Sequence, residues 1–246
     1  TWKNNNRRDP ANFDGWRWWC ARARTEGRAG HIMGWRTDGV PDTGWQQDDA
    51  IAYYPELADC WRYGPIDGEP TGQFADSAAA ATGLTWLAGK RGGLVNFKYT
   101  NISSGTWLSD AITPWRSTSG YHLHPSRVVI PASATAAQTW NAEVEVRNDG
   151  FQRAFSRFHA PYIRFVPASG TTVTKRLPVD LTMLEPGASA IARVRGITLP
   201  AGTYSVQVGL AAAEGIASVP RMRWSLNQAG CTDTSGGGNW CTVGSL

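Results

Sequence analysis

The sequence lacks the marks of several protein classes. No apolar run approaches the roughly 18 residues that a membrane span requires, so we expect no span. The 24 lysines and arginines are scattered among 246 residues and the formal net charge is only +4, so we expect no nucleic-acid partner. The sequence also lacks a glycine-rich phosphate loop and a serine nucleophile elbow, and we expect no cofactor.

Cysteine and histidine are scarce, with four of each. Cys231 and Cys241 flank a polar, glycine-rich loop that a disulfide would close, which leaves Cys20 to pair with Cys60. Four cysteines allow three pairings, and a zinc site is the alternative. Because no C-x₂-C unit occurs and the histidines are not clustered with the cysteines, we favour disulfides and expect no metal. Disulfides predict a secreted, extracellular protein.

Tryptophan is abundant, with 13 residues, and the hydrophobic and charged fractions of 41% and 18% are typical of a folded globular chain. The composition changes near residue 120, from tryptophan-dense and alanine-rich to valine- and threonine-rich. We therefore divide the chain into a first domain at 1–118, a second at 119–229 and a cysteine-closed tail at 230–246.

The first domain alternates helical and strand patterns, which predicts parallel strands with crossover helices. Helices are expected at 13–24, 46–59 and 73–88, and strands at 29–36, 61–66 and 93–99. Three such repeats predict a partial (β/α) barrel-like segment.

The second domain has the pattern of short strands separated by turns. In 140–147, apolar and polar residues alternate with a period of two, which indicates a strand with one wet face. About seven such strands predict an antiparallel β-sandwich. The expected fold class is therefore α/β plus all-β.

Several short motifs carry a resemblance to a known family. They occur in the order Arg28-Ala29-Gly30-His31, Asp38-Gly39, Asp67-Gly68-Glu69, Leu94-Val95-Asn96-Phe97-Lys98-Tyr99 and Val144-Glu145-Val146-Arg147-Asn148-Asp149-Gly150-Phe151. The chain resembles a bacterial secreted family described as a domain of unknown function. Its members look like the closing half of a glycosidase-type (β/α)₈ barrel followed by a β-sandwich.

The chain departs from that family in two places. An Asn-Asp pair that usually follows the histidine is replaced here by a stretch ending in Trp35-Arg36-Thr37-Asp38, and the opening half of the barrel does not precede the segment. The resemblance thus implies a processed fragment, one chain of a split protein or a rearranged relative. A half barrel exposes sheet edges, so a second chain or self-association is expected to complete it.

The candidate catalytic residues are carboxylates, because glycoside hydrolysis uses two of them. Glu69 matches, by strand position in the resemblance, the acid at the end of the seventh barrel strand, where such enzymes often place the nucleophile. Asp67 and Asp38 are the other candidates. The alternative for Glu69 is an acid that pairs with an arginine in a turn, and the alternative for Asp38 is an ordinary Thr-Asp-Gly turn.

Aromatic and polar residues near the expected strand ends are candidates for sugar contacts. The set comprises His31, Trp35, Trp45, Asn96, Tyr99 and Trp107, although core packing explains any single tryptophan equally well. The sequence thus predicts a glycoside-hydrolase-like protein that acts on or binds polysaccharide or oligosaccharide. The alternatives are a non-catalytic carbohydrate-binding protein and a structural subunit of an extracellular assembly.

Overall fold

The structure is a computed structural model, and the residues that it describes are 14–25, 35–38, 51–52, 54–70, 74–95, 106, 108–117, 119–214, 216, 222–226, 229–235 and 238–246. The chain divides into two compact units. The first unit comprises residues 1–121 and 150–155, and the second comprises 122–149 and 156–246. No helix in the described ranges is both long enough and apolar enough to cross a bilayer.

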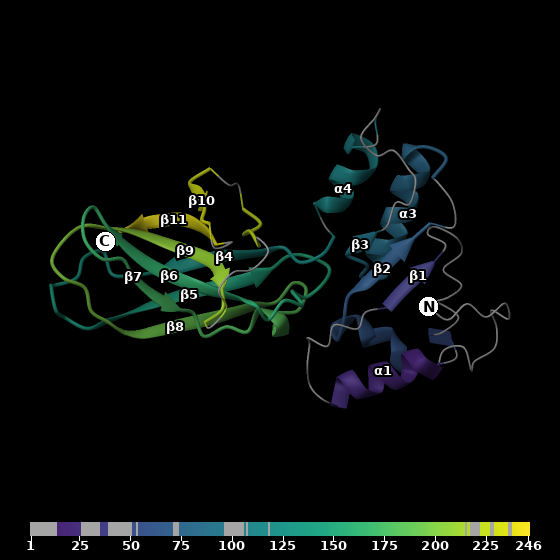
Figure 1. Cartoon of the computed structure of the whole chain (residues 1–246), viewed down its shortest axis with the longest axis horizontal. Helices are drawn as coiled ribbons and strands as arrows, with labels where there is room; N and C mark the ends of the chain where they lie inside the picture. Colours follow the sequence, from purple (N-terminus) through teal and green to yellow (C-terminus); the bar gives the residue numbers. More distant parts are fainter. Residues whose placement is uncertain are drawn as a thin grey trace. The chain divides into compact units, whose positions relative to one another are not determined.

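A small parallel sheet lies at the centre of the first unit (Figure 1). Its strands are β1 (Trp35–Asp38), β2 (Ile66–Glu69) and β3 (Leu94–Val95), in that spatial order, and both pairings are parallel. The expected partial (β/α) barrel is wrong. Three strands of four, four and two residues form an open sheet, and no barrel-like segment occurs in the described part of the chain.

Most strand residues belong instead to antiparallel sheets of the second unit. The expected strand at 61–66 was also misplaced. Trp61 and Arg62 end a 3₁₀ helix, η2 (Pro55–Arg62), and the strand begins only at Ile66. The idea that a second chain completes the barrel loses its basis with the barrel itself.

Helices pack around the sheet of the first unit. α1 (Asp14–Thr25) buries Trp19, Cys20 and Ala23, and the alanine-rich α3 (Ser77–Gly89) buries Ala80, Gly83, Leu84 and Leu87. Asp76 caps α3 by accepting a 2.8 Å hydrogen bond from the Ala79 backbone N–H. Two short helices, η3 (Leu108–Ile112) and α4 (Thr113–Arg116), follow β3. Together with Leu57, Ile66 and Phe74, these elements form one hydrophobic core.

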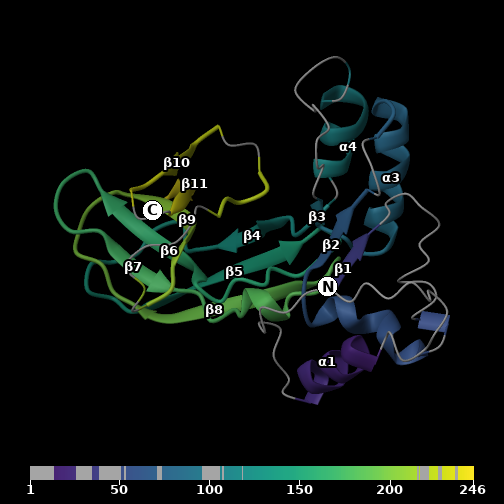
Figure 2. The ribbon, with the colours of Figure 1, turned by 45° about the vertical axis from the view of Figure 1, so that its right-hand side comes forward.

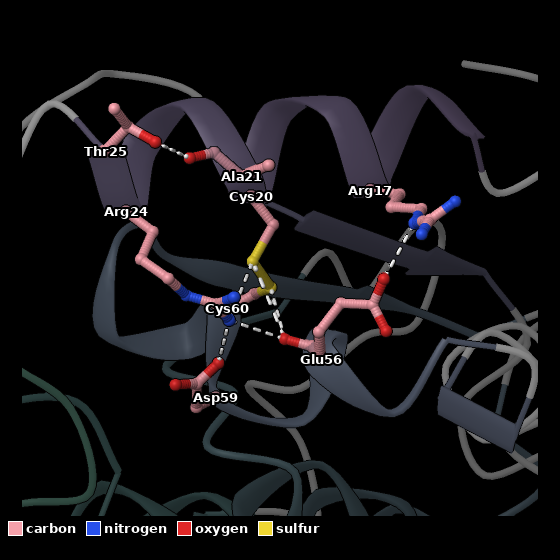
Figure 3. Close-up of a disulfide and its surroundings, with 8 residues drawn as sticks. All are labelled: Arg17, Cys20, Ala21, Arg24, Thr25, Glu56, Asp59 and Cys60. Carbon is pink, nitrogen blue, oxygen red and sulfur yellow. Dashed lines mark hydrogen bonds and ion pairs between the residues drawn. A yellow bond between two sulfur atoms is a disulfide. The ribbon is translucent and has the colours of Figure 1, made fainter.

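A disulfide between Cys20 and Cys60 joins α1 to η2 (Figure 3). Around it, the Arg24 guanidinium donates a 2.7 Å hydrogen bond to the Glu56 carbonyl oxygen and a 2.6 Å bond to Asp59 Oδ1. Both sulfurs are almost fully buried. The bridge therefore fixes the position of α1 against η2, two helices that are not joined by the hydrogen bonds of a sheet.

The second unit is built from two antiparallel sheets in a sandwich-like arrangement (Figure 2). The three-stranded sheet has the order β4-β5-β8, and the five-stranded sheet has the order β10-β11-β9-β6-β7. The strand bounds are β4 (Leu123–Val129), β5 (Trp140–Asn148), β6 (His159–Pro167), β7 (Val173–Arg176), β8 (Ser189–Ile197), β9 (Tyr204–Ala212), β10 (Cys231–Asp233) and β11 (Asn239–Ser245).

Alternating side chains from both sheets fill the interior of this second unit. Val144 and Val146 of β5 and Phe165 and Val208 of the larger sheet are fully buried. The Trp140 and Phe165 rings meet edge to face, with centroids 5.2 Å apart. The period-2 pattern of residues 140–147 is therefore a strand with one buried face, as the sequence predicts.

The cysteine-closed tail is part of the larger sheet. β11 pairs with β9, and Cys231 lies directly opposite Cys241, to which it is disulfide-bonded. Both disulfides that the sequence predicts are thus formed, and no cysteine is free.

Candidate functional site

The carboxyl ends of the parallel strands bring two of the candidate acids together. Asp38 is the last residue of β1 and Glu69 the last residue of β2, and the two are Cα partners in the parallel register. Neighbouring strands lie about 4.8 Å apart. In open parallel sheets, ligands bind at this carboxyl edge, so the register places two carboxylate-bearing positions where such a sheet offers a site.

Charge is confined to one face of this small sheet. Arg36 is the Cα partner of Asp67, two positions before the Asp38–Glu69 pair, so strand alternation assigns all four positions to the same face. The other face has no charged position and is mostly apolar: Ile66 is buried in the core, and Val95 packs against that core. We call the positions Arg36, Asp38, Asp67 and Glu69 the charged face.

A covered parallel sheet is normally apolar on both faces. Four charged positions on ten strand residues are therefore unusual for a parallel sheet. Asp67 itself is half-buried. Carboxylates, the groups at three of these positions, accept hydrogen bonds from hydroxyl groups.

Close packing determines how the chain enters β3. The Gly93 N–H donates a 3.2 Å hydrogen bond to the Ile66 carbonyl oxygen, and a Cβ on Gly93 would meet the Gln152 side chain at less than 3.0 Å. The Gln152 amide nitrogen in turn donates to the Arg91 carbonyl oxygen. Glycine at position 93 therefore leaves room for the Gln152 side chain at the start of β3.

The other predicted site residues do not join the charged face in the described structure. Trp35 begins β1 rather than lying in a loop, and its register position opposite Ile66 puts it on the apolar face. His31, Trp45, Asn96, Tyr99 and Trp107 lie outside the described residues.

A polar cluster at the start of α3 was not predicted from the sequence. Ser77 Oγ donates a 3.1 Å hydrogen bond to Asp110 Oδ2, and Ser109 Oγ donates a 2.8 Å bond to Asp110 Oδ1. Hydrogen bonds from Thr106 and then Ser109 hold the pKa of Asp110 below its ordinary value. The adjacent residues Ser109 and Asp110 are too common a pair to indicate such a cluster. Its third member, Ser77, lies far from them in the sequence.

One group of three potential metal ligands lies together in the described part of the chain. Cys20, Asp59 and Cys60 place their ligand atoms within 4.8 Å of one another. Because the two cysteines share a disulfide, they offer no thiolate to a metal. The zinc alternative is therefore wrong for Cys20 and Cys60. These two cysteines also have no free thiol for redox chemistry.

Comparison with known proteins adds no family assignment. No family model matches the chain, and no curated protein matches it. The resemblance to a glycosidase-related family is therefore a hypothesis that depends on the short motifs alone, and the charged face is the structural basis for a functional proposal.

Proposed function

We propose that the protein is an extracellular carbohydrate-binding protein that holds a polysaccharide or oligosaccharide on its charged face. The observation that carries the proposal is the in-register pair of Asp38 and Glu69 at the carboxyl ends of β1 and β2. Two carboxylates on adjacent strands suit adjacent hydroxyl groups of one sugar ring, since each ionised carboxylate accepts several hydrogen bonds.

The two disulfides support the extracellular part of this proposal, because disulfides persist in oxidising compartments. The short family motifs, which include the Asp67-Gly68-Glu69 stretch, support the carbohydrate part. Glu69, which the resemblance assigns as the nucleophile, is also one of the two in-register acids.

Hydrolysis is the second candidate, and the same pair favours it. Retaining glycosidases hold two carboxyl groups about 5–5.5 Å apart, which is close to the spacing of neighbouring strands. In this hypothesis Glu69 is the nucleophile, and Asp38 protonates the leaving oxygen and then activates the water that releases the sugar.

Binding is tested with a panel of soluble polysaccharides and oligosaccharides, measured by calorimetry and by tryptophan fluorescence. Asp38→Asn and Glu69→Gln should each weaken binding by about 10- to 100-fold, the range for a lost hydrogen bond to a charged group. Glu214→Gln is the matched control, because Glu214 is exposed and lies in the second unit. Unchanged affinity in both site variants, or no binding to any glycan, would disprove the proposal.

Hydrolysis is tested by mass spectrometry of the products released from a bound glycan. Glu69→Gln should abolish release, while the Glu214→Gln control should retain it. Cleavage that persists in Glu69→Gln removes Glu69 from catalysis. Binding without any release of product supports the non-catalytic form of the proposal.

A further inference from the structure

Arg157 and Arg176 are among the arginines of the second unit that have no acidic partner in the described residues. Arg157 and Arg176 are exposed, and neither forms an ion pair with any acid in the described part of the chain. Four other arginines of the same unit do form such pairs, namely Arg127, Arg147, Arg193 and Arg223. Arg157 and Arg176 therefore keep their hydrogen-bond donors available to a ligand.

Arg157 and Arg176 line the same open cavity, whose volume is about 510 Å³. Arg157 precedes β6, and Arg176 is the last residue of β7, opposite Tyr162 of β6. Asp180 also lines the cavity, but its Oδ1 accepts hydrogen bonds from the Thr182 N–H at 2.9 Å and the Thr182 hydroxyl at 2.7 Å. The lining thus carries two arginines and one carboxylate that is already hydrogen-bonded, which gives the cavity a net positive charge.

A more apolar cavity of about 380 Å³ adjoins the basic one. The two share Pro178, Val179 and Asp180 as lining residues. Met183 and Ile191 line the apolar cavity, and their side chains are 52% and 49% exposed. Large apolar side chains this exposed, beside a positive depression, are typical of a surface that binds a ligand.

We propose that the adjoining cavities bind a small amphiphilic anion, whose phosphate, sulfate or carboxylate group contacts Arg157 and Arg176 and whose aliphatic part covers Met183 and Ile191. A guanidinium presents planar, paired donors that match such oxyanions. The aliphatic part removes exposed apolar surface from water. This site lies wholly within the second unit and does not depend on the charged face of the first.

The test uses calorimetry on the full chain at low ionic strength, with hexyl phosphate, inorganic phosphate and hexanol as probes. Hexyl phosphate should bind more tightly than either of the other two. Arg157→Gln and Arg176→Gln should each weaken hexyl phosphate at least tenfold. Ile191→Gln should weaken hexyl phosphate while leaving the affinity for inorganic phosphate unchanged.

Arg195→Gln is the matched control, because Arg195 is another exposed arginine of this unit, has no ion pair among the described residues and lines neither cavity. It should bind hexyl phosphate like the unaltered protein. Far-ultraviolet circular dichroism checks that each variant is folded. The site is disproved if hexyl phosphate does not bind, if both cavity arginine variants bind normally, or if hexanol binds equally well. Equal affinity for inorganic phosphate and hexyl phosphate would show that the apolar cavity does not contribute to binding.

Discussion

The indole ring of Trp240 lies directly against the backbone of Gly209. The two residues are Cα partners on β11 and β9, and a Cβ built on Gly209 would come within 3.0 Å of three ring atoms of Trp240. Trp240 is only 7% exposed, and Arg164 stacks on it with the guanidinium carbon 3.9 Å from a ring centroid. Glycine at position 209 thus makes room for a buried tryptophan between two strands.

Gly209→Ala should therefore lower the free energy of unfolding of the second unit by about 1–3 kcal/mol, the usual cost of overpacking. The change is measured by urea denaturation with tryptophan fluorescence. Gly244→Ala is the control, because Gly244 lies on β11, the strand of Trp240, and a Cβ there meets no atom within 4 Å. Equal stability of the two variants would show that the Trp240 ring moves aside without cost.

The two disulfides should differ in their contribution to stability. Cys20 and Cys60 are separated by 40 positions, whereas Cys231 and Cys241 are separated by 10. On the chain-entropy account, the double replacement Cys20→Ala/Cys60→Ala costs about 4 kcal/mol and Cys231→Ala/Cys241→Ala about 3 kcal/mol.

Hydrogen exchange followed by mass spectrometry assigns each loss to a unit. The first double variant should raise exchange in peptides of α1 and η2, and the second in peptides of β10 and β11. Each unaltered unit serves as the control for the other. Faster exchange spread equally over both units would mean that they unfold as one. The stabilisation by each disulfide could then not be assigned to a single unit.

The ionised carboxylate of Glu56 should stabilise the first unit at neutral pH, and this stabilisation should be lost in acid. Its pKa is lowered first by a hydrogen bond from its own backbone N–H and then by the Arg17 guanidinium, whose Nε lies 2.7 Å from Glu56 Oε1. Because the folded-state pKa is below the unfolded one, the stabilisation is complete above the ordinary pKa and is lost as the pH falls through the folded value.

Glu56→Gln should thus be less stable than the unaltered protein at pH 7, and the difference should shrink towards pH 3. The effect is expected to be small because the pair is exposed. Denaturant midpoints at several pH values measure it, and Glu214→Gln should show no such convergence. A Glu56→Gln difference that stays constant with pH would contradict the ion-pair explanation.

The second unit could be read from the sequence because its pattern is local. Alternation along residues 140–147 specifies which side chains face inward, and the burial of Val144 and Val146 follows it. Likewise, the polar loop between Cys231 and Cys241 indicated their pairing, since close cysteines with a flexible loop bridge easily.

The first unit was harder because aromatic residues suit helices and strands alike. Trp61 and Tyr63 read as strand residues, but Pro55 starts a 3₁₀ helix whose end they occupy, and the strand is the short Ile66–Glu69 that follows. The parallel order was correctly predicted, whereas closure into a barrel depends on the number of strands, which no local pattern specifies.

Asp38 and Glu69 were expected near strand ends, and each is the last residue of its strand. Their register could not be read from the sequence, because the pairing of β1 with β2 joins segments that lie far apart in the chain. Arg157 and Arg176 gave no signal at all, since only the pairing of β6 and β7 brings them to one cavity.

The place of β11 in the larger sheet has a consequence for synthesis on the ribosome. β9 lies between β6 and β11 in space, yet β11 is translated some 30 residues later. Until residues 239–245 emerge, one side of β9 has unpaired amide and carbonyl groups, which invite pairing with another nascent chain. The β10–β11 hairpin therefore covers this edge of β9 only after the other strands of the sheet have been translated.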